Sequence, residues 1–516
     1  MSLIIILVVL IIALVLIHDH IRKRSYRWKM LSQFPGDPPL PLIGNAMQIG
    51  FDADEASSRL MTLWRKFGMT EFRVTVGSED WVFLSNPENV GVILNHQTEL
   101  CKPVERNMAM RPFFGNSLST SEGERWRSTR KLMAPSFQFK TLEKRVSAVN
   151  MQCDRLFNVL DNLANKGPVD MYRYLRPFMF DLLCNTLMGV TFNLLDNPDH
   201  PYLIASEKVI KTITINYFSY WRNIHSLFVL TPMYRDMMAT IKTIRDTSDD
   251  LIMRRKQILN ELIEDVRNNN KNITDYDVED IIRNKILDND CLLDTLLLST
   301  VPSGEPTPNE MINEEITLVC YTGHYTTTMT MSHTLYCLAK YPQIQQKVLD
   351  EQRAIFKNDS SKSPTLNDLS QMKYLEAVIK ESIRVIPTLT KIGRQLQNDL
   401  TLKDGRVIPA GTSVIVFYEA MYADPKIFPN PEKYYPERFY NTNAMHTFAF
   451  VPFSAGPRNC IGFRFAWVAM KTILSNILRR YEVIPGEPGA EPQFANRIST
   501  ESKNGVQLTL RNRTLN

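Results

Sequence analysis

Apolar residues follow two different patterns along the chain. Residues 2–17, SLIIILVVLIIALVLI, form an uninterrupted apolar run. From about residue 55 to residue 390, apolar residues instead recur at helical spacing between polar breaks. The stretch from Glu310 to Lys340 is apolar on several sides and free of proline, so we expect a long, buried helix there. The pattern predicts a largely helical body behind an apolar amino-terminal segment.

Shorter stretches alternate between apolar and polar residues. EFRVTVG at 71–77 predicts a strand, and LKDGRVIPAGTSVIVF at 402–417 predicts a hairpin because its Asp-Gly pair suits a tight turn. We expect a second hairpin around Asn504-Gly505. The predicted fold class is mainly α with small β sheets.

The apolar run is suited to crossing a membrane. Its sixteen residues would span about 24 Å as a helix, and extension through Ile21 brings the basic residues that follow to the membrane surface. Positive charge after the run, rather than before it, favours a signal anchor over a cleaved signal peptide, and the positive-inside rule then leaves the rest of the chain in the cytosol. We expect a single-pass protein of the endoplasmic-reticulum membrane.

Three segments follow from this organisation. We predict a transmembrane signal anchor over residues 1–21, and a basic stop with a proline-rich hinge over 22–45, where FPGDPPLPLIGN stiffens the chain. Residues 46–516 form one large catalytic domain, because no Gly/Ser-rich linker or internal repeat divides them.

Composition excludes some functions. The formal net charge of +5 is small for 516 residues, so nucleic-acid binding is not implied. The seven cysteines are scattered, odd in number and without a CxxC pair, which argues against a disulfide framework and a zinc cluster. They are Cys101, Cys153, Cys184, Cys291, Cys320, Cys337 and Cys460.

Cys460 has neighbours that suit a metal ligand. It lies in PFSAGPRNCIGFRFA, residues 452–466, before an apolar helical pattern. A nucleophilic role would need a histidine base, and nothing in the sequence indicates which histidine would pair with Cys460. Amide groups at the start of the following helix can stabilise a thiolate, and a haem iron needs only one protein ligand on one face. An inert core cysteine is the competing interpretation, and it does not explain the neighbours.

Four of those neighbours suit a flat, acidic cofactor. Gly456 and Gly462 allow a sharp turn and a close approach of the backbone. Phe453 can shield the sulfur, and Arg458 can neutralise a carboxylate at the edge of the cofactor.

The sequence F-x-x-G-x-R-x-C-x-G resembles the haem-thiolate signature of the cytochrome P450 family, and the resemblance extends over nearly the whole chain from the proline hinge onward. It implies the P450 fold, haem b, and Cys460 as axial ligand of the haem iron. It also implies that Glu381 and Arg384 form a structural network with Arg438 of YYPERF. Trp126 and Arg130 of the W-x-x-x-R motif, together with Arg394, match residues that contact the haem propionates.

Two longer stretches, RPFFGNSLSTSEGERWRSTRKLMAPSFQF and the cysteine loop, are similar to the microsomal family-4 clan, whose better-known members oxidise fatty acids and related lipids. Some members of that clan carry a glutamate at the position of Thr322 that esterifies a haem methyl group. Threonine cannot form this ester, so we expect non-covalent haem.

The central helix departs from the family pattern. In YTGHYTTT, residues 321–328, Tyr325 occupies the position of the acid that usually precedes the threonine, here Thr326. The pair normally delivers protons to dioxygen. Tyr325 is a poor relay near neutral pH because a tyrosine pKa is near 10, and His324 titrates in a useful range but points about 100° away from its neighbour. Three outcomes are open. Water can carry the protons, activated dioxygen can be released as peroxide, or the enzyme can isomerise or dehydrate a peroxidised lipid, which needs no proton relay.

The resemblance therefore implies a membrane-bound monooxygenase that inserts one atom of dioxygen into a small, apolar, lipid-like substrate. Electrons would come from NADPH through NADPH–cytochrome P450 reductase, with cytochrome b5 as a possible auxiliary, because no nicotinamide or flavin fingerprint is present. The basic residues expected to face these acidic donors are Arg125, Arg127, Lys131 and Arg464. Two alternatives are a haem-thiolate isomerase or dehydratase of lipid hydroperoxides, and a non-catalytic haem carrier or sensor.

Overall fold

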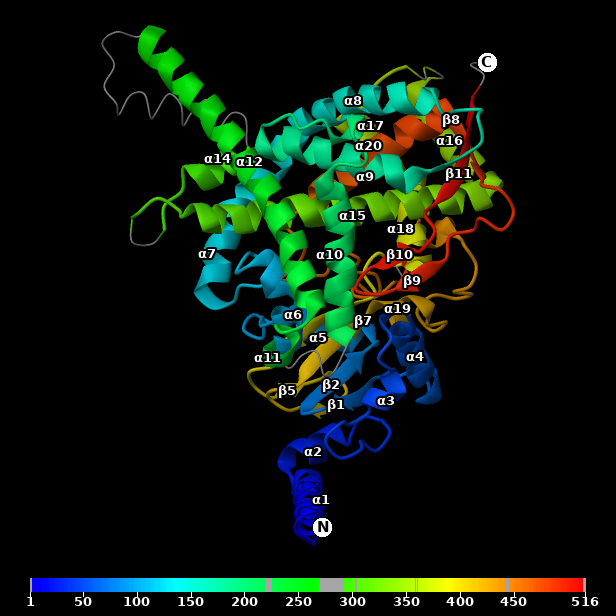
Figure 1. Ribbon diagram of the computed structural model, residues 1–516. Coiled ribbons are helices and arrows are strands. Elements are labelled where there is room, and N and C mark those ends of the chain that lie inside the picture. The colour runs from blue at the N-terminus through cyan, green and yellow to red at the C-terminus, as the bar shows by residue number, and fades with distance from the viewer. Residues whose placement is uncertain are drawn as a thin grey trace.

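Helices make up most of the protein, and small sheets lie to one side of them (Figure 1). This computed structural model describes residues 2–218, 225–269, 291–301, 304–357, 359, 361–440 and 445–513. The predicted class, mainly α with small β sheets, is confirmed. A single apolar helix projects away from the body at the amino terminus.

The helices cover most of the described chain. They are α1 (Ser2–Arg24), α2 (Tyr26–Leu31), α3 (Ala46–Ile49), α4 (Ala53–Lys66), α5 (Pro87–Leu94), α6 (Val104–Phe114), α7 (Gly123–Met133), α8 (Phe139–Asp161), α9 (Met171–Leu183), α10 (Pro201–Phe218), α11 (His225–Phe228), α12 (Pro232–Asn269), α14 (Leu292–Leu297), α15 (Asn309–Lys340), α16 (Pro342–Phe356), α17 (Leu366–Gln371), α18 (Lys373–Val385), α19 (Tyr418–Ala423) and α20 (Phe463–Arg480).

The strands are short and come from distant parts of the chain. They are β1 (Phe72–Val76), β2 (Glu79–Leu84), β3 (Pro168–Asp170), β4 (Lys391–Gln395), β5 (Leu400–Thr401), β6 (Val407–Ile408), β7 (Ser413–Phe417), β8 (Tyr481–Pro485), β9 (Phe494–Asn496), β10 (Thr500–Ser502) and β11 (Gln507–Asn512). The largest sheet has the order β1-β2-β7-β4, and a second sheet has the order β3-β11-β8.

Helix α15 is the long central helix that the apolar pattern predicts. It crosses the body of the protein and packs against α9, α12, α18 and α20 (Figure 1). Most of its side chains are buried, which explains why it is apolar on several sides rather than along one stripe. The helix therefore brings residues 321–328 to the centre of the molecule.

Sequence reasoning located the strands better than it paired them. The strand predicted at 71–77 is β1, but the segment 402–417 contributes to two sheets: β5 pairs with β6, whereas β7 pairs with β2 and β4. The hairpin predicted around Asn504-Gly505 is wrong, because β10 pairs with β9 and β11 pairs with β3 and β8. Strands β7 and β11 therefore pair with strands that are distant in sequence, whereas β5 and β6, like β9 and β10, pair as neighbours.

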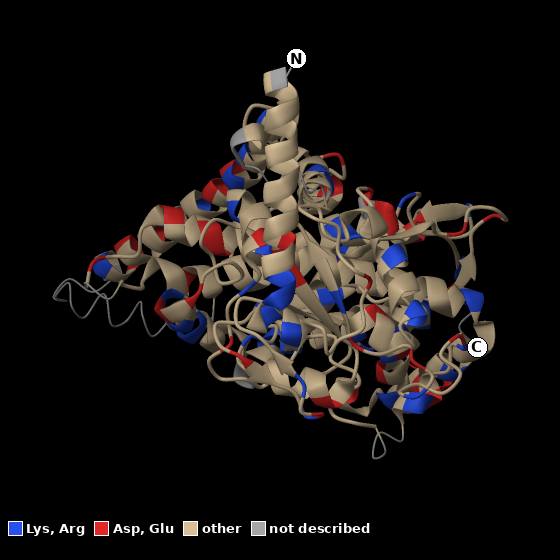
Figure 2. Ribbon diagram, turned by 90° about the horizontal axis from the view of Figure 1, so that it is seen from below, with Lys and Arg blue, Asp and Glu red and all other residues tan. Residues whose placement is uncertain are grey.

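Helix α1 is long and apolar enough to cross a membrane, with a mean hydropathy of 2.8 over its best window. It continues through the basic residues, where Figure 2 shows blue segments at the junction with the body. Arg22 Nη2 lies 2.7 Å from Asp80 Oδ1 and Arg27 Nε lies 2.8 Å from Asp80 Oδ2. The basic stop therefore reaches the domain itself, and one carboxylate of the β1–β2 sheet binds two guanidinium groups at the base of α1.

Candidate functional site

The cysteine loop holds its thiol at the start of α20. The Cys460 N–H donates to the Phe453 carbonyl at 2.9 Å. Burial raises the pKa of the Cys460 thiol, while the Gly462 N–H and the Arg130 guanidinium act in the opposite direction. The Cys460 side chain is nevertheless exposed, because protein atoms do not cover its surface. A thiol that is accessible and also desolvated lies on an internal space rather than on the outer surface.

The glycines of this loop have different reasons to be glycine. Gly456 has φ +68°, and a Cβ at this position would lie 1.9 Å from the carbonyl oxygen of Leu94. Gly462 has an ordinary φ of −88° and caps α20. Phe453 is half-buried, with its ring 5.9 Å from that of Trp467.

Helix α7 contacts the loop from one side. Arg130 donates through Nη1 to the Asn459 carbonyl at 2.9 Å and through Nη2 to the Asn459 side chain. The Arg458 guanidinium stacks 4.6 Å above the centre of the buried Trp126 ring. Arg458 also donates to the Ser121 carbonyl at 3.0 Å. The two α7 residues of the W-x-x-x-R motif are therefore held against the cysteine loop.

Four basic side chains gather beside this loop. They are Lys102, Arg106, Arg394 and Arg458. Burial, together with the guanidinium groups of Arg394 and Arg106, lowers the pKa of Arg458 to about 9. Burial lowers the pKa of Arg394 to about 10 and holds that of Lys102 well below its ordinary value. Within the described ranges none of the four forms a salt bridge with a carboxylate.

This donor set fits a haem. Buried cations are costly unless a counter-charge meets them, and among the described residues Arg394 Nε and Nη2 and Arg458 Nε and Nη1 are buried without a hydrogen-bond partner. Lys102 and Arg106 are partly accessible although burial is the main cause of their lowered pKa values, so they border an internal space as Cys460 does. Two propionates would meet the cations, and a thiolate would meet the iron.

A buried ion network lies on helix α18. Arg384 forms two hydrogen bonds of 2.8 Å with the Glu381 carboxylate, and Arg438 Nε lies 3.2 Å from Glu381 Oε1. Arg384 also donates to the Tyr422 and Lys433 carbonyls at 3.0 and 3.1 Å. The structure thus brings the three residues of the expected network together.

In helix α15, two threonine hydroxyls turn back onto their own helix. Thr322 donates to the Leu318 carbonyl and Thr326 to the Thr322 carbonyl, each at 2.8 Å. His324 is buried, and burial lowers its pKa to about 3. The expectation that His324 titrates in a useful range is therefore wrong, because its aromatic surroundings keep the ring neutral.

Tyr325 has a partner that sequence reasoning missed. Its hydroxyl donates to Oε1 of Glu501, on strand β10, and accepts a hydrogen bond from Ser499 at 3.2 Å. Lys102 and Arg106 of the basic cluster were also missed. No local motif marks these residues, because each reaches the site from a segment distant in sequence. The sequence shows the partner of Tyr325 only as a carboxylate near the end of the chain.

Basic residues on the cysteine-loop side differ in exposure and in whether a carboxylate pairs with them. Arg125 pairs with Glu314 at 3.0 Å and is half-buried, whereas Arg127, Lys131 and Arg464 are exposed. A hollow of about 330 Å³ opens at the start of the cysteine loop, lined in part by Lys380, Phe453 and Trp467. This face combines positive charge with an apolar recess.

Comparisons with known proteins agree with this geometry. The family model described as Cytochrome P450 matches residues 34–508. Cytochrome P450 4d2 of Drosophila melanogaster is 32% identical over 484 residues, covering 93% of this chain and 94% of the relative. Probable cytochrome P450 4e1 of the same organism is 31% identical over 461 residues, covering 89% and 84%. Cytochrome P450 4e5, mitochondrial, of Drosophila mettleri is 31% identical over 448 residues, covering 86% and 83%.

Proposed function

The chain belongs to the cytochrome P450 family, and from this premise we propose that it is a membrane-anchored haem-thiolate monooxygenase for lipid-like substrates, with Cys460 as the iron ligand. Family membership establishes a P450 monooxygenase with non-covalently bound haem b, a redox partner that passes on electrons from NAD(P)H, and a hydrophobic substrate. The assignment of individual residues, the identity of the donor and the membrane belong to the proposal.

The observation that carries the residue assignment is the thiol of Cys460 facing an internal space beside a group of unpaired cations. The Gly462 N–H and Arg130 lower the cost of keeping the sulfur as a thiolate. Arg130 also fixes the peptide before the cysteine through Asn459, so the sulfur keeps its direction. These contacts orient one strong ligand toward one face of a planar cofactor.

The basic cluster supports a role in binding the acidic edge of haem. Arg394 and Arg458 have unpaired N–H groups, and charge-assisted bonds to carboxylates are about twice as strong as neutral ones. Arg458 is held in place by Trp126 and the Ser121 carbonyl. Lys102 and Arg106 add positive charge on the same side.

Residues of α15 would supply protons to the haem site. When bound, haem supplies the iron at which dioxygen is activated for insertion into the substrate. The Thr326 hydroxyl would turn from the Thr322 carbonyl to hydrogen-bond there, and the Tyr325 hydroxyl would hold a proton. Aromatic rings around His324 exclude water and keep this part of the helix dry.

The expected electron donor is NADPH–cytochrome P450 reductase, with cytochrome b5 as an auxiliary, at the endoplasmic-reticulum membrane. Exposed Arg127, Lys131 and Arg464 support a basic docking face for an acidic donor. Exchanging the three for glutamine should slow haem reduction and weaken its salt dependence. A relative named as mitochondrial makes subcellular fractionation the test of location.

The carbon monoxide difference spectrum of the reduced protein tests the central assignment. Wild-type protein and Cys153→Ala, which changes a buried cysteine of α8, should both show the red-shifted Soret band of thiolate ligation. Cys460→Ser should lose it. Product formed only from lipid hydroperoxides, and never from NADPH and dioxygen, would support the isomerase alternative instead.

A further inference from the structure

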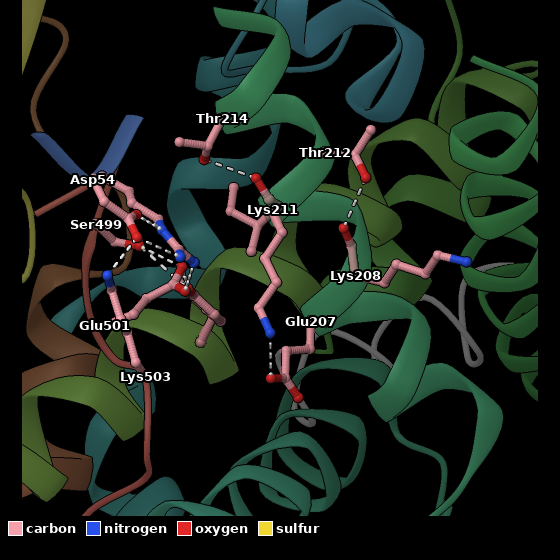
Figure 3. Close-up of polar contacts among 12 residues, drawn as sticks. Asp54, Glu207, Lys208, Lys211, Thr212, Thr214, Ser499, Glu501 and Lys503 are labelled. Atoms are coloured by element: carbon pink, nitrogen blue, oxygen red, sulfur yellow. Dashed lines mark hydrogen bonds and ion pairs between the residues drawn. The ribbon is translucent and has the colours of Figure 1, made fainter. Parts of the chain in front are cut away.

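Position 325 lacks the acid that the proton-relay motif normally carries, yet the fold brings a carboxylate into contact with the side chain at that position. Glu501 lies 176 positions further along the chain, and its Oε1 accepts the hydrogen bond of Tyr325 Oη. Ser499 donates to both groups, to Tyr325 Oη at 3.2 Å and to Glu501 Oε1 at 3.4 Å. Figure 3 shows Glu501 and Ser499 within this polar cluster.

The position of Glu501 is fixed by the strand that carries it. Thr500, its neighbour in β10, donates through Oγ1 to the Pro387 carbonyl at 2.6 Å and through its N–H to the Thr388 carbonyl at 3.1 Å. Thr388 in turn bonds Thr330 of α15, one helical turn beyond Thr326, at 2.8 Å. The strand is therefore tied to the helix on which the proton is needed.

We propose that Glu501 supplies the acid function that α15 lacks at position 325 and passes protons to the haem site through the hydroxyl of Tyr325. This inference rests on the proposed monooxygenase function. Because its side chain contacts Tyr325, Ser499 and Arg497, Glu501 is assigned the role of a positioning and proton-holding residue.

A chain of polar contacts leads from Glu501 to solvent. Glu501 Oε2 accepts a hydrogen bond from Arg497 at 3.2 Å, Arg497 pairs with Asp54 at 2.6 Å, and Asp54 pairs with Lys503 at 2.6 Å. The exposed fractions of these side chains rise from 8% at Glu501 to 17%, 25% and 45%. Because charged arginine and lysine side chains cannot accept a proton, these contacts hold Glu501 near the surface by α4, and water delivers the proton directly to its 8% exposed carboxyl.

The pair can do what a tyrosine alone cannot. Tyr325 alone is a poor proton source, because its pKa is raised well above 10 and nothing replaces the proton that leaves. When Glu501 is protonated, the hydrogen bond between them reverses: Glu501 donates to Tyr325 Oη, and the tyrosine hydrogen, which points at Glu501 in the structure, turns toward the haem site. One proton enters Glu501 from solvent, one leaves Tyr325 Oη, no covalent bond other than O–H changes, and the redox partner supplies the electrons.

Burial and the hydrogen bonds donated to Glu501 act in opposite directions on the pKa of its carboxyl. Burial raises the pKa of Glu501 and nearby Glu207 adds to this, whereas Tyr325, Arg497 and Lys211 act in the opposite direction. Lys211 is itself paired with Glu207 at 3.0 Å, as Figure 3 shows. On the α4 side, Asp54 faces Arg497 rather than Glu501.

The test compares Glu501→Gln and Tyr325→Phe with a matched control. Tyr481, Asp161 and Arg480 form a second tyrosine–carboxylate–arginine group, so Asp161→Asn removes a similar contact elsewhere in the fold. Each protein is reduced by NADPH and reductase with dodecanoic acid as the probe, and peroxide per NADPH is measured across pH. The infrared band of a protonated carboxyl, recorded on the full-length protein as purified, gives an independent readout.

We expect Glu501→Gln and Tyr325→Phe to release several-fold more peroxide per NADPH, to lower product per NADPH about 10-fold or more, and to flatten its pH profile. Glu501→Asp should restore part of the wild-type profile, Asp161→Asn should match wild type, and the infrared band should vanish in Glu501→Gln. An unchanged infrared band, or the same peroxide share and pH profile in wild type and Glu501→Gln, would overturn the proposal. A wild-type protein without the red-shifted carbon monoxide band would instead refute the proposed function, and the infrared result would then decide on Glu501 alone.

Discussion

Gly456 lies against the backbone of Leu94, so closely that a Cβ on residue 456 would stand 1.9 Å from the Leu94 carbonyl oxygen. Gly456→Ala therefore forces the cysteine loop away from the end of α5, in addition to the roughly 1–2 kcal/mol that a left-handed backbone costs a residue with a Cβ. We expect lower haem content and a lower melting temperature.

Gly405→Ala is the control for this prediction. Gly405 also has a positive φ, +85°, but nothing lies within 4 Å of a Cβ placed there. Gly405→Ala should lose only the stability that a left-handed backbone costs a residue with a Cβ, and it should keep its haem. Equal losses of haem in the two variants would contradict the close approach at Gly456.

Arg458 should matter for holding haem. Arg458→Met keeps much of the side-chain volume over Trp126 but removes the charge and its N–H groups. Loss of a hydrogen bond to a charged group costs about 1.5–3 kcal/mol, so haem should transfer to apomyoglobin about 10- to 100-fold faster. Arg511→Met, which removes an exposed arginine from β11, should leave the transfer rate unchanged.

The network on α18 predicts a large effect on stability. Glu381→Gln leaves the buried Arg384 and Arg438 without their shared carboxylate, and removing one partner of a buried pair costs about 3–5 kcal/mol. Urea unfolding should show this loss. Lys347→Ala breaks an exposed pair with Glu437 and should cost less than about 1 kcal/mol; a comparable loss would argue against the buried network.

Two buried histidines predict acid sensitivity. Burial lowers the pKa values of His324 and His333 to about 3, below that of an unfolded histidine. The unfolded chain therefore binds more protons between pH 6.5 and 3, so the stability these residues provide is complete above about pH 6.5 and falls as pH decreases.

His324→Phe should remove part of this slope. The difference in unfolding free energy between pH 7 and pH 5 should shrink by about 2 kcal/mol relative to wild type. His446→Phe, at an exposed position, is the control and should keep the wild-type slope. An unaltered slope in His324→Phe would mean that the ring is protonated in the folded protein.

Sequence reasoning was strongest where residues act within one local segment. The long helix α15 follows from the apolar pattern along the chain, the cysteine loop from a local motif, and the Glu381–Arg384 pair from the family resemblance together with its one-turn spacing. It failed where partners come from distant segments, as with β11, which pairs with β3 and β8 rather than with the preceding strand β10. The acid at Tyr325 belongs to the same class, because the local motif shows only that a carboxylate is missing.

The junction at Asp80 has a consequence for membranes of different thickness. A helix of 23 residues is about 34 Å long, and the endoplasmic-reticulum and plasma-membrane cores are about 27 and 32 Å thick. A free anchor would adjust by tilting alone. Since Arg22 at the end of this helix and Arg27 of the adjoining α2 both bind Asp80 of the β1–β2 sheet, tilting the anchor leans the body over the lipid, so bilayer thickness sets how deeply the protein settles on its surface.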